Sequence, residues 1–131
     1  WDEVMKINLR APYLLTQSVM PLLKQSADAA IIFMGSRVAR KARPFWGAYA
    51  VSKYGVEGLS LLLAEELANT SNIRVNCVNP GATRTMMRAK AYPAEDPVNV
   101  TPPQALMPLF LFLMGYDSKG MTGQSIDAQP K

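Results

Sequence analysis

Two short apolar runs separated by one long apolar segment constrain the fold of this chain more than any other feature. Residues 29–34 (AAIIFM) form a continuous apolar run, and residues 73–78 (IRVNCV) form a second run that ends at Asn79–Pro80–Gly81. Both have the length of strands in a buried parallel sheet. Residues 48–69 lie between them with the apolar character of a helix. The sequence therefore predicts a βαβ unit with parallel strands, and hence an α/β fold.

Further elements are predicted on both sides of this unit. Apolar residues recur at helical spacing over residues 2–25, and acidic residues open that segment. After the second strand we expect a short helix over residues 84–91, a proline-rich loop over 92–103 and a helix over 104–114. Residues 124–127 are expected to form the last strand.

Pro12 lies inside the first predicted helix. Because proline has no N–H, the backbone carbonyl of Asn8, four residues earlier, loses its usual helical partner. One interpretation is a kink that leaves this carbonyl free to bind water. The other is a helix that bends around a core, with Asn8 as a surface amide. The segment alone does not choose between them.

The composition excludes several kinds of chemistry. The 131 residues include no histidine, which rules out Ser–His and Cys–His nucleophile pairs and argues against a metal site. The single cysteine, Cys77, is expected to be a small core residue. An unpaired cysteine suits a reducing compartment, and we expect a cytoplasmic protein. The apolar run 105–114 is too short to span a bilayer and contains Pro108, so no membrane segment is expected.

The net charge is +4, and four of the fourteen basic residues lie close together. Arg37, Arg40, Lys41 and Arg43 follow the first predicted strand closely. They form either a solvated loop or a patch that steers an anionic ligand. Nucleic acid is a less suitable partner, because no interleaved aromatic residues accompany these charges.

Candidate catalytic residues converge on one edge of the predicted sheet. In Tyr49–Ala50–Val51–Ser52–Lys53, the tyrosine and the lysine lie four residues apart and share a helical face. An ammonium beside a phenol favours the phenolate, which makes the tyrosine a better proton donor and acceptor near neutral pH. Ligands of such sheets bind beyond the carboxyl ends of the strands. Ser36 and Pro80–Gly81 occupy those ends, and Tyr49 opens the following helix.

This ordered set of residues resembles the short-chain dehydrogenase/reductase family. The resemblance rests on Ser36, the Tyr49/Lys53 pair, Asn79–Pro80–Gly81 and Asn8, and it covers essentially the whole chain. It implies a Rossmann-type doubly wound parallel sheet, of which residues 1–131 would be the C-terminal part of a single domain. The family's glycine-rich dinucleotide-binding half would then lie upstream of Trp1.

Three shorter motifs point to one branch of this family. The segments TRTMMRA (83–89), AEDP (94–97) and DAQP (127–130) are similar to the YciK-like bacterial oxidoreductases. Most of the family ends its last strand with an Asp-Gly-Gly-like turn. Here Ala128 and Gln129 follow Asp127, and this departure concerns the wall of the substrate pocket.

The resemblance implies a role for each of four residues. Tyr49 would transfer a proton to or from the substrate oxygen while a hydride moves between nicotinamide and carbon. Ser36 would hold that oxygen by a hydrogen bond. Lys53 would assist Tyr49 and bind the nicotinamide ribose. Asn8 would hold a water that connects Lys53 to solvent, in agreement with the free carbonyl that Pro12 suggests.

The resemblance also implies cofactor contacts. Pro80 and Gly81 would let the backbone approach the nicotinamide, and Thr83 and Thr85 would contact its carboxamide and phosphates. A structural role for the threonines remains an alternative, because Thr is common in turns after strands. The cofactor would be NADP or NAD, and the residues that choose between them would lie upstream.

Three functions remain open from the sequence. The first is an NAD(P)-dependent oxidoreductase acting on a small alcohol or carbonyl compound. The second is a non-catalytic dinucleotide- or partner-binding protein on the same scaffold, and the third is an isomerase or lyase that keeps its cofactor bound. Because the helix over residues 48–69 is apolar around most of its circumference, we also expect a homodimer or homotetramer formed through the two long helices.

Overall fold

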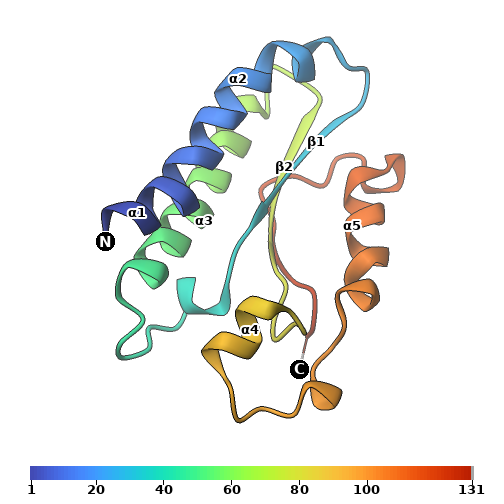
Figure 1. Cartoon of the computed structure of the whole chain (residues 1–131). Helices are drawn as coiled ribbons and strands as arrows, with labels where there is room; N and C mark the ends of the chain where they lie inside the picture. Colours follow the sequence, from blue (N-terminus) through green and yellow to red (C-terminus); the bar gives the residue numbers. More distant parts are fainter. Residues whose placement is uncertain (131) are drawn as a thin grey trace.

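Three parallel strands in the order β1–β2–β3 form the centre of the molecule (Figure 1). The computed structural model describes residues 1–130. Strand β1 is Ala29–Met34, β2 is Ile73–Asn79 and β3 is Ser125–Asp127. In register, β1 pairs with β2 from Ala29 opposite Ile73 onward, and β3 pairs with the last three residues of β2. The predicted parallel α/β sheet is confirmed.

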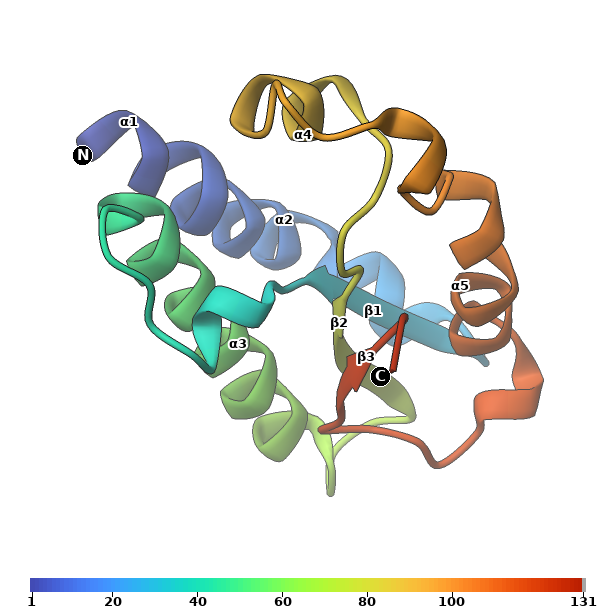
Figure 2. The same cartoon turned by 90° about the horizontal axis from the view of Figure 1, so that it is seen from below.

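Helices cover both faces of this sheet, as expected for a doubly wound fold (Figures 1 and 2). The N-terminal helix and α3 (Gly47–Leu67) lie side by side on one face. Helix α5 (Met107–Met114) lies on the other face. The short helix α4 (Met86–Ala91) lies beyond the carboxyl end of β2. The arrangement leaves the carboxyl ends of β1 and β2 accessible between α3 and α4.

The N-terminal helix is continuous but changes its winding just before Pro12. It consists of α1 (Asp2–Met5), a π-helical segment (Lys6–Arg10) and α2 (Ala11–Gln25). The backbone N–H of Ala11 donates to the carbonyl of Lys6, five residues back. The irregularity that Pro12 predicts is therefore a π turn, a feature often found at functional sites. Helix α2 also tolerates a second proline, Pro21.

Small residues let α3 lie close to the sheet. Its buried stripe has a spacing of four residues: Ser52, Val56, Ser60 and Ala64. Val56 and Ala64 belong to the same buried cluster as Val75 and Cys77 of β2, every residue of which is buried. Leu113 of α5 is fully buried on the opposite face. Each fully buried Val or Leu contributes about 1.5–3 kcal/mol through burial, so this contact stabilises the βαβ unit that the sequence predicts.

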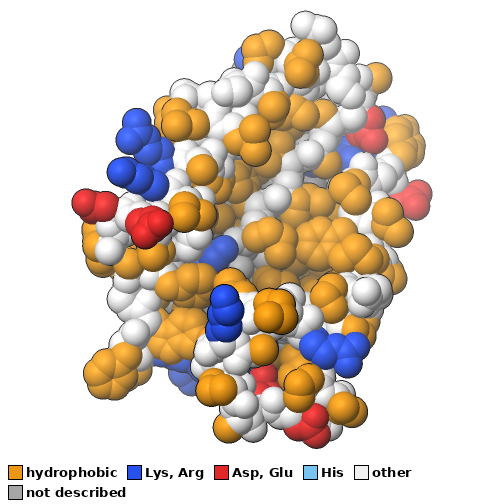
Figure 3. Space-filling view, viewed as in Figure 1, with side chains coloured by type: hydrophobic (Ala, Val, Ile, Leu, Met, Phe, Trp, Pro, Cys, Tyr) orange, Lys and Arg blue, Asp and Glu red, His pale blue; other side chains and the backbone are white. Residues whose placement is uncertain are grey.

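Strand β1 has a strand neighbour on one side only within residues 1–130. Beside it, a groove of about 650 Å³ runs between α2 and β1. Figure 3 shows hydrophobic side chains gathered across the middle of this face. Leu15 from α2 and Ile31 from β1 are among the groove residues. Within the described chain, one edge of β1 is therefore unpaired.

The observed boundaries differ slightly from the expected ones. The helix expected over residues 104–114 begins as a 3-10 turn, Pro103–Leu106, before α5. The helix expected over 84–91 starts at Met86, because Thr85 caps it. In the described part of the chain, no helix combines the length and the apolar character needed to cross a membrane. Nor do residues 1–130 bring three His, Cys, Asp or Glu side chains together in a metal-binding arrangement.

Candidate active site

A cavity of about 390 Å³ lies at the carboxyl ends of β1 and β2. It is lined by six of the eight site residues that the sequence singles out: Ser36, Tyr49, Pro80, Gly81, Thr83 and Thr85. The remaining two, Asn8 and Lys53, line the neighbouring groove beside β1. Met34 lines both spaces and lies between them. The structure therefore gathers the predicted residues around one end of the sheet.

Lys53 lies one turn beyond Tyr49 on α3, as the spacing predicts. Its Nζ is 5.7 Å from the centre of the Tyr49 ring and donates a hydrogen bond to the carbonyl oxygen of Met34 at 2.8 Å. Burial lowers the pKa of the Lys53 ammonium below its ordinary value. The last residue of β1 thus holds a partly buried cation near the phenol.

Asn8 is tied to the same helix through Ser52. The Asn8 Nδ2 donates to Ser52 Oγ at 3.1 Å, and Ser52 Oγ donates to the carbonyl oxygen of Tyr49 at 2.7 Å. Ser52 is fully buried. The half-buried Asn8 side chain thus joins the π turn to Ser52 of α3, which supports the first interpretation better than that of a surface amide. Whether the Asn8 carbonyl binds water stays a prediction.

Ser36 lies two residues after the end of β1 and caps a short 3-10 helix, Arg37–Ala39, by accepting from the Val38 N–H. Gly35, just before it, has no room for a side chain, because a Cβ there would lie 2.7 Å from Cys77 Sγ. Cys77 is buried, and burial raises the pKa of its thiol to about 11. The prediction that Cys77 is a core residue is confirmed.

The turn after β2 is held by side chains from the end of the chain. Gly81 adopts a left-handed φ of 72°, and its N–H donates to Asn79 Oδ1 at 3.2 Å. Asn79 Nδ2 in turn donates to Asp127 Oδ1 at 2.7 Å. Gln129 Nε2 donates to the carbonyls of Pro80 and Ala82, at 2.7 and 2.8 Å.

Gln129 also binds the loop that returns from α4. Its Oε1 accepts from Thr101 Oγ1 at 2.7 Å, so the side chain amide joins three segments. Sequence reasoning noticed the Asp127–Ala128–Gln129–Pro130 departure but assigned Gln129 no role. Only the folded chain shows that this glutamine secures the Pro80–Ala82 turn.

The two threonines are placed differently. Thr85 caps α4, its Oγ1 accepting from the Arg88 N–H at 3.2 Å, so its hydroxyl proton can still be donated. Thr83 forms a bridge with Thr101, and its hydroxyl lies 3.4 Å from the carbonyls of Pro80 and Gly81. The structural alternative is therefore better supported for Thr83 than for Thr85.

The basic loop after Ser36 contributes none of its four cations to the described lining of this cavity. Arg40 is bound elsewhere. It forms ion pairs with Glu57 at 3.0 Å and Asp127 at 3.1 Å, and it donates to Ser125 Oγ. Arg40 thus joins α3 to β3 instead of presenting its charge to a ligand.

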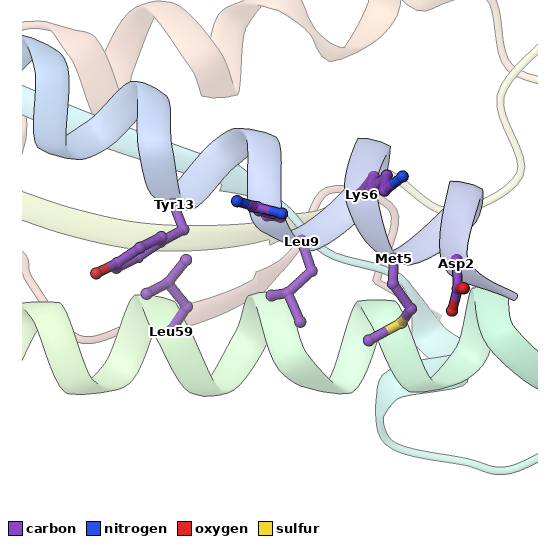
Figure 4. Close-up of a pocket in the computed structure, with 7 residues that line it drawn as sticks. Asp2, Met5, Lys6, Leu9, Tyr13 and Leu59 are labelled. Carbon is purple, nitrogen blue, oxygen red and sulfur yellow. The ribbon is translucent and has the colours of Figure 1, made fainter.

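A second cavity of about 510 Å³ lies between the N-terminal helix and α3 (Figure 4). Met5, Leu9 and Tyr13 point from the N-terminal helix toward α3, where Leu59 lies. Farther along α3, Leu62 is 65% exposed. The cavity is therefore partly apolar, with Asp2, Lys6 and Arg10 also in its lining, and Tyr49 does not line it.

Comparison with known proteins identifies the class. Residues 1–96 match the family model of the short chain dehydrogenases, and the chain belongs to this family. It is 48% identical over 130 residues to YciK of Escherichia coli strain K12, an uncharacterized oxidoreductase. That match covers 99% of this chain and 51% of YciK.

Solved structures agree with this result. The crystal structure of a short chain dehydrogenase from Shigella flexneri 2a in complex with NADP is 49% identical and superposes with a TM-score of 0.95. The match covers 99% of this chain and 54% of the Shigella chain. A relative from E. coli CFT073 in complex with NADPH is 48% identical, with a TM-score of 0.94 and coverage of 99% of this chain and 53% of that one. The chain spans about half the length of these relatives.

Proposed function

We propose that this chain is the catalytic, C-terminal part of an NAD(P)-dependent oxidoreductase that interconverts a carbonyl compound and an alcohol. The observation that carries the proposal is the shared cavity of Ser36, Tyr49 and the Pro80–Gly81 turn at the carboxyl ends of β1 and β2. Family membership and the relatives crystallised with NADP and NADPH support it.

The residues of this chain suit the nicotinamide end of such a cofactor. Gly81 gives the cavity wall a turn without a side chain, and the Thr85 hydroxyl can donate to an anionic or amide oxygen. When bound, the nicotinamide would supply a hydride to the carbonyl carbon or accept one from the alcohol. The adenosine half has no glycine-rich loop in this sequence, so we propose that a preceding dinucleotide-binding half provides it.

Proton transfer falls to Tyr49. In the reductive direction its O–H donates to the substrate oxygen while Ser36 Oγ donates a hydrogen bond to the same oxygen. The phenolate left behind is stabilised by the Lys53 ammonium. Lys53 lies beside the groove that Asn8 also lines, and a water held there would return a proton from solvent. In the oxidative direction the steps are reversed.

Replacing Tyr49 by phenylalanine in the full-length natural protein tests this role. Only the phenolic oxygen is lost, so kcat for NADPH-dependent reduction should fall by about 10²- to 10⁴-fold with cofactor affinity nearly unchanged. Tyr54→Phe, on the same helix but outside the described cavity lining, is the matched control. A Tyr49→Phe enzyme that keeps more than a few per cent of wild-type kcat would remove Tyr49 as the proton donor.

We further propose that the protein self-associates through α3 and the N-terminal helix. Tyr54, Leu61 and Leu62 expose 46%, 45% and 65% of their surfaces, which is a large apolar area to leave in water. The assembly would be a homodimer or a homotetramer. A cytoplasmic location is part of the same proposal, supported by the single, buried cysteine, and cell fractionation tests it.

A further inference from the structure

Most of the wall of the Tyr49 cavity is apolar, and it includes the aromatic rings of Trp46, Tyr92 and Phe110. The Trp46 ring lies 5.6 Å from the Tyr49 ring and 6.3 Å from the Tyr92 ring, measured between centres. Further apolar side chains come from α4, from the 3-10 turn before α5 and from α5 itself: Met87, Leu106, Met107 and Phe110. Such a lining favours a ligand with an apolar body, because burial removes the apolar surfaces of both partners from water.

One formally charged residue, Arg88, stands among the described residues that line this cavity. Its charge is already balanced. Arg88 Nε donates to Glu95 Oε2 at 2.7 Å, and Nη2 donates to Oε1 at 2.6 Å, which is a bidentate ion pair. The guanidinium carbon also lies 3.7 Å from the centre of the Tyr92 ring.

Each member of this ion pair shifts the pKa of the other toward the charged form. The hydrogen bond from Arg88 lowers the pKa of the Glu95 carboxyl, and the same contact raises the pKa of Arg88. Glu95 therefore remains ionised at neutral pH and neutralises the guanidinium. An anionic substrate would lose its water of hydration on entering this cavity. It would find no unpaired cation there to replace the lost hydration, so its binding would cost free energy.

We propose that this site takes a neutral carbonyl compound, or the corresponding alcohol, with an apolar and preferably aromatic body, and that the Arg88–Glu95 pair discriminates against substrates that carry a carboxylate. This inference rests on the proposed oxidoreductase function. It also assigns the basic loop no part in substrate choice, because Arg37, Arg40, Lys41 and Arg43 lie outside the described lining.

A matched pair of aldehydes tests the substrate class. Methyl 4-formylbenzoate and 4-formylbenzoate share one aromatic aldehyde and differ in one methyl group and one negative charge. With the full-length natural protein and NADPH, kcat/KM should be at least about tenfold higher for the ester, a ratio equivalent to about 1.4 kcal/mol. Equal values, or a preference for the carboxylate, would overturn the inference.

Two variants test whether Glu95 is the reason. Glu95→Gln keeps the side-chain shape and leaves the Arg88 charge uncompensated, so the ratio should move about fivefold or more toward the carboxylate. Asp96→Asn is the control, because it makes the same charge change at the next residue, which caps the 3-10 helix Pro97–Asn99 and has no described bond to Arg88. A shift in Glu95→Gln no larger than that in Asp96→Asn would refute the role of the pair.

A binding measurement separates this inference from the proposed function. The fluorescence of Trp46, taken as the difference between the wild-type protein and Trp46→Phe, should be quenched when a ligand enters the cavity. This quenching measures the binding of the two corresponding benzyl alcohols, the methyl ester and the carboxylate. Tighter binding of the neutral alcohol supports the substrate class even if neither aldehyde is reduced, and that lack of turnover would count against the oxidoreductase function alone. Equal or tighter binding of the carboxylate overturns the substrate class whatever the turnover.

Discussion

Replacing Gln129 by alanine removes three hydrogen bonds, two of which are to the turn that follows β2. The amide donates to the carbonyls of Pro80 and Ala82 and accepts from Thr101. A neutral hydrogen bond contributes about 0.5–1.5 kcal/mol net, so the sum lies between about 1.5 and about 4.5 kcal/mol. Ala82 is exposed and Pro80 half-buried, and water can replace part of what is lost. We therefore expect a loss of about 2 kcal/mol.

The assay is urea unfolding of the full-length natural protein, with hydrogen exchange over residues 80–83 as a local readout. Because Pro80 and Gly81 line the candidate site, KM for NADPH should rise by about tenfold, which corresponds to about 1.4 kcal/mol, while kcat changes little. Gln124→Ala is the matched control. Its amide is exposed and makes one local hydrogen bond, to the carbonyl of Thr122 at 3.2 Å.

The result that refutes this reasoning is specific. If Gln129→Ala and Gln124→Ala differ by less than about 0.5 kcal/mol in unfolding free energy, the side chain does not secure the turn. An unchanged exchange rate at residues 80–83 would lead to the same conclusion.

Three further changes probe the site and the helix surface. Lys53→Arg should move the basic limb of the pH profile of kcat/KM to higher pH. Burial lowers the pKa of Lys53, whereas an arginine stays charged, and rates measured from about pH 6 to about pH 11 check this. Gly81→Ala should cost about 1–2 kcal/mol of unfolding free energy, because φ is 72° there and a Cβ would lie 3.1 Å from Gln129 Nε2; urea unfolding measures it. Leu62→Glu should shift the full-length protein toward monomer in light scattering, because an exposed apolar residue of α3 becomes charged.

Each of these three predictions can be contradicted by a specific result. A basic limb that stays in place in Lys53→Arg would mean that another group sets it. Gly120→Ala, with φ of 83° and open space for a Cβ, is the control for strain without a clash, and equal losses at the two glycines would leave no role for the contact with Gln129. An assembly of unchanged mass in Leu62→Glu would show that α3 is not the interface. Lys90→Gln, on exposed α4, lowers the net charge by the same single unit and is the control.

The sequence alone determined the βαβ unit and the residues at its carboxyl end. Strand and helix periodicities are local properties, so AAIIFM and IRVNCV could be recognised as buried strands without a structure. The Tyr49/Lys53 spacing likewise defines one helical face wherever the helix lies. Because parallel strands end at the same edge, Ser36 and Pro80–Gly81 could be expected beside Tyr49, and the cavity lining agrees.

Only the tertiary structure decided which side chains complete the site. Asn8 meets Ser52 across 44 positions, Asn79 meets Asp127 across 48, and Gln129 meets Pro80 across 49. No periodicity links residues so far apart, since their contacts depend on how the helices pack on the sheet. The basic loop shows the same limit: its charges were visible in the sequence, but packing bound Arg40 to Glu57 and Asp127. The fold likewise placed Arg88, already paired with Glu95, in the cavity wall.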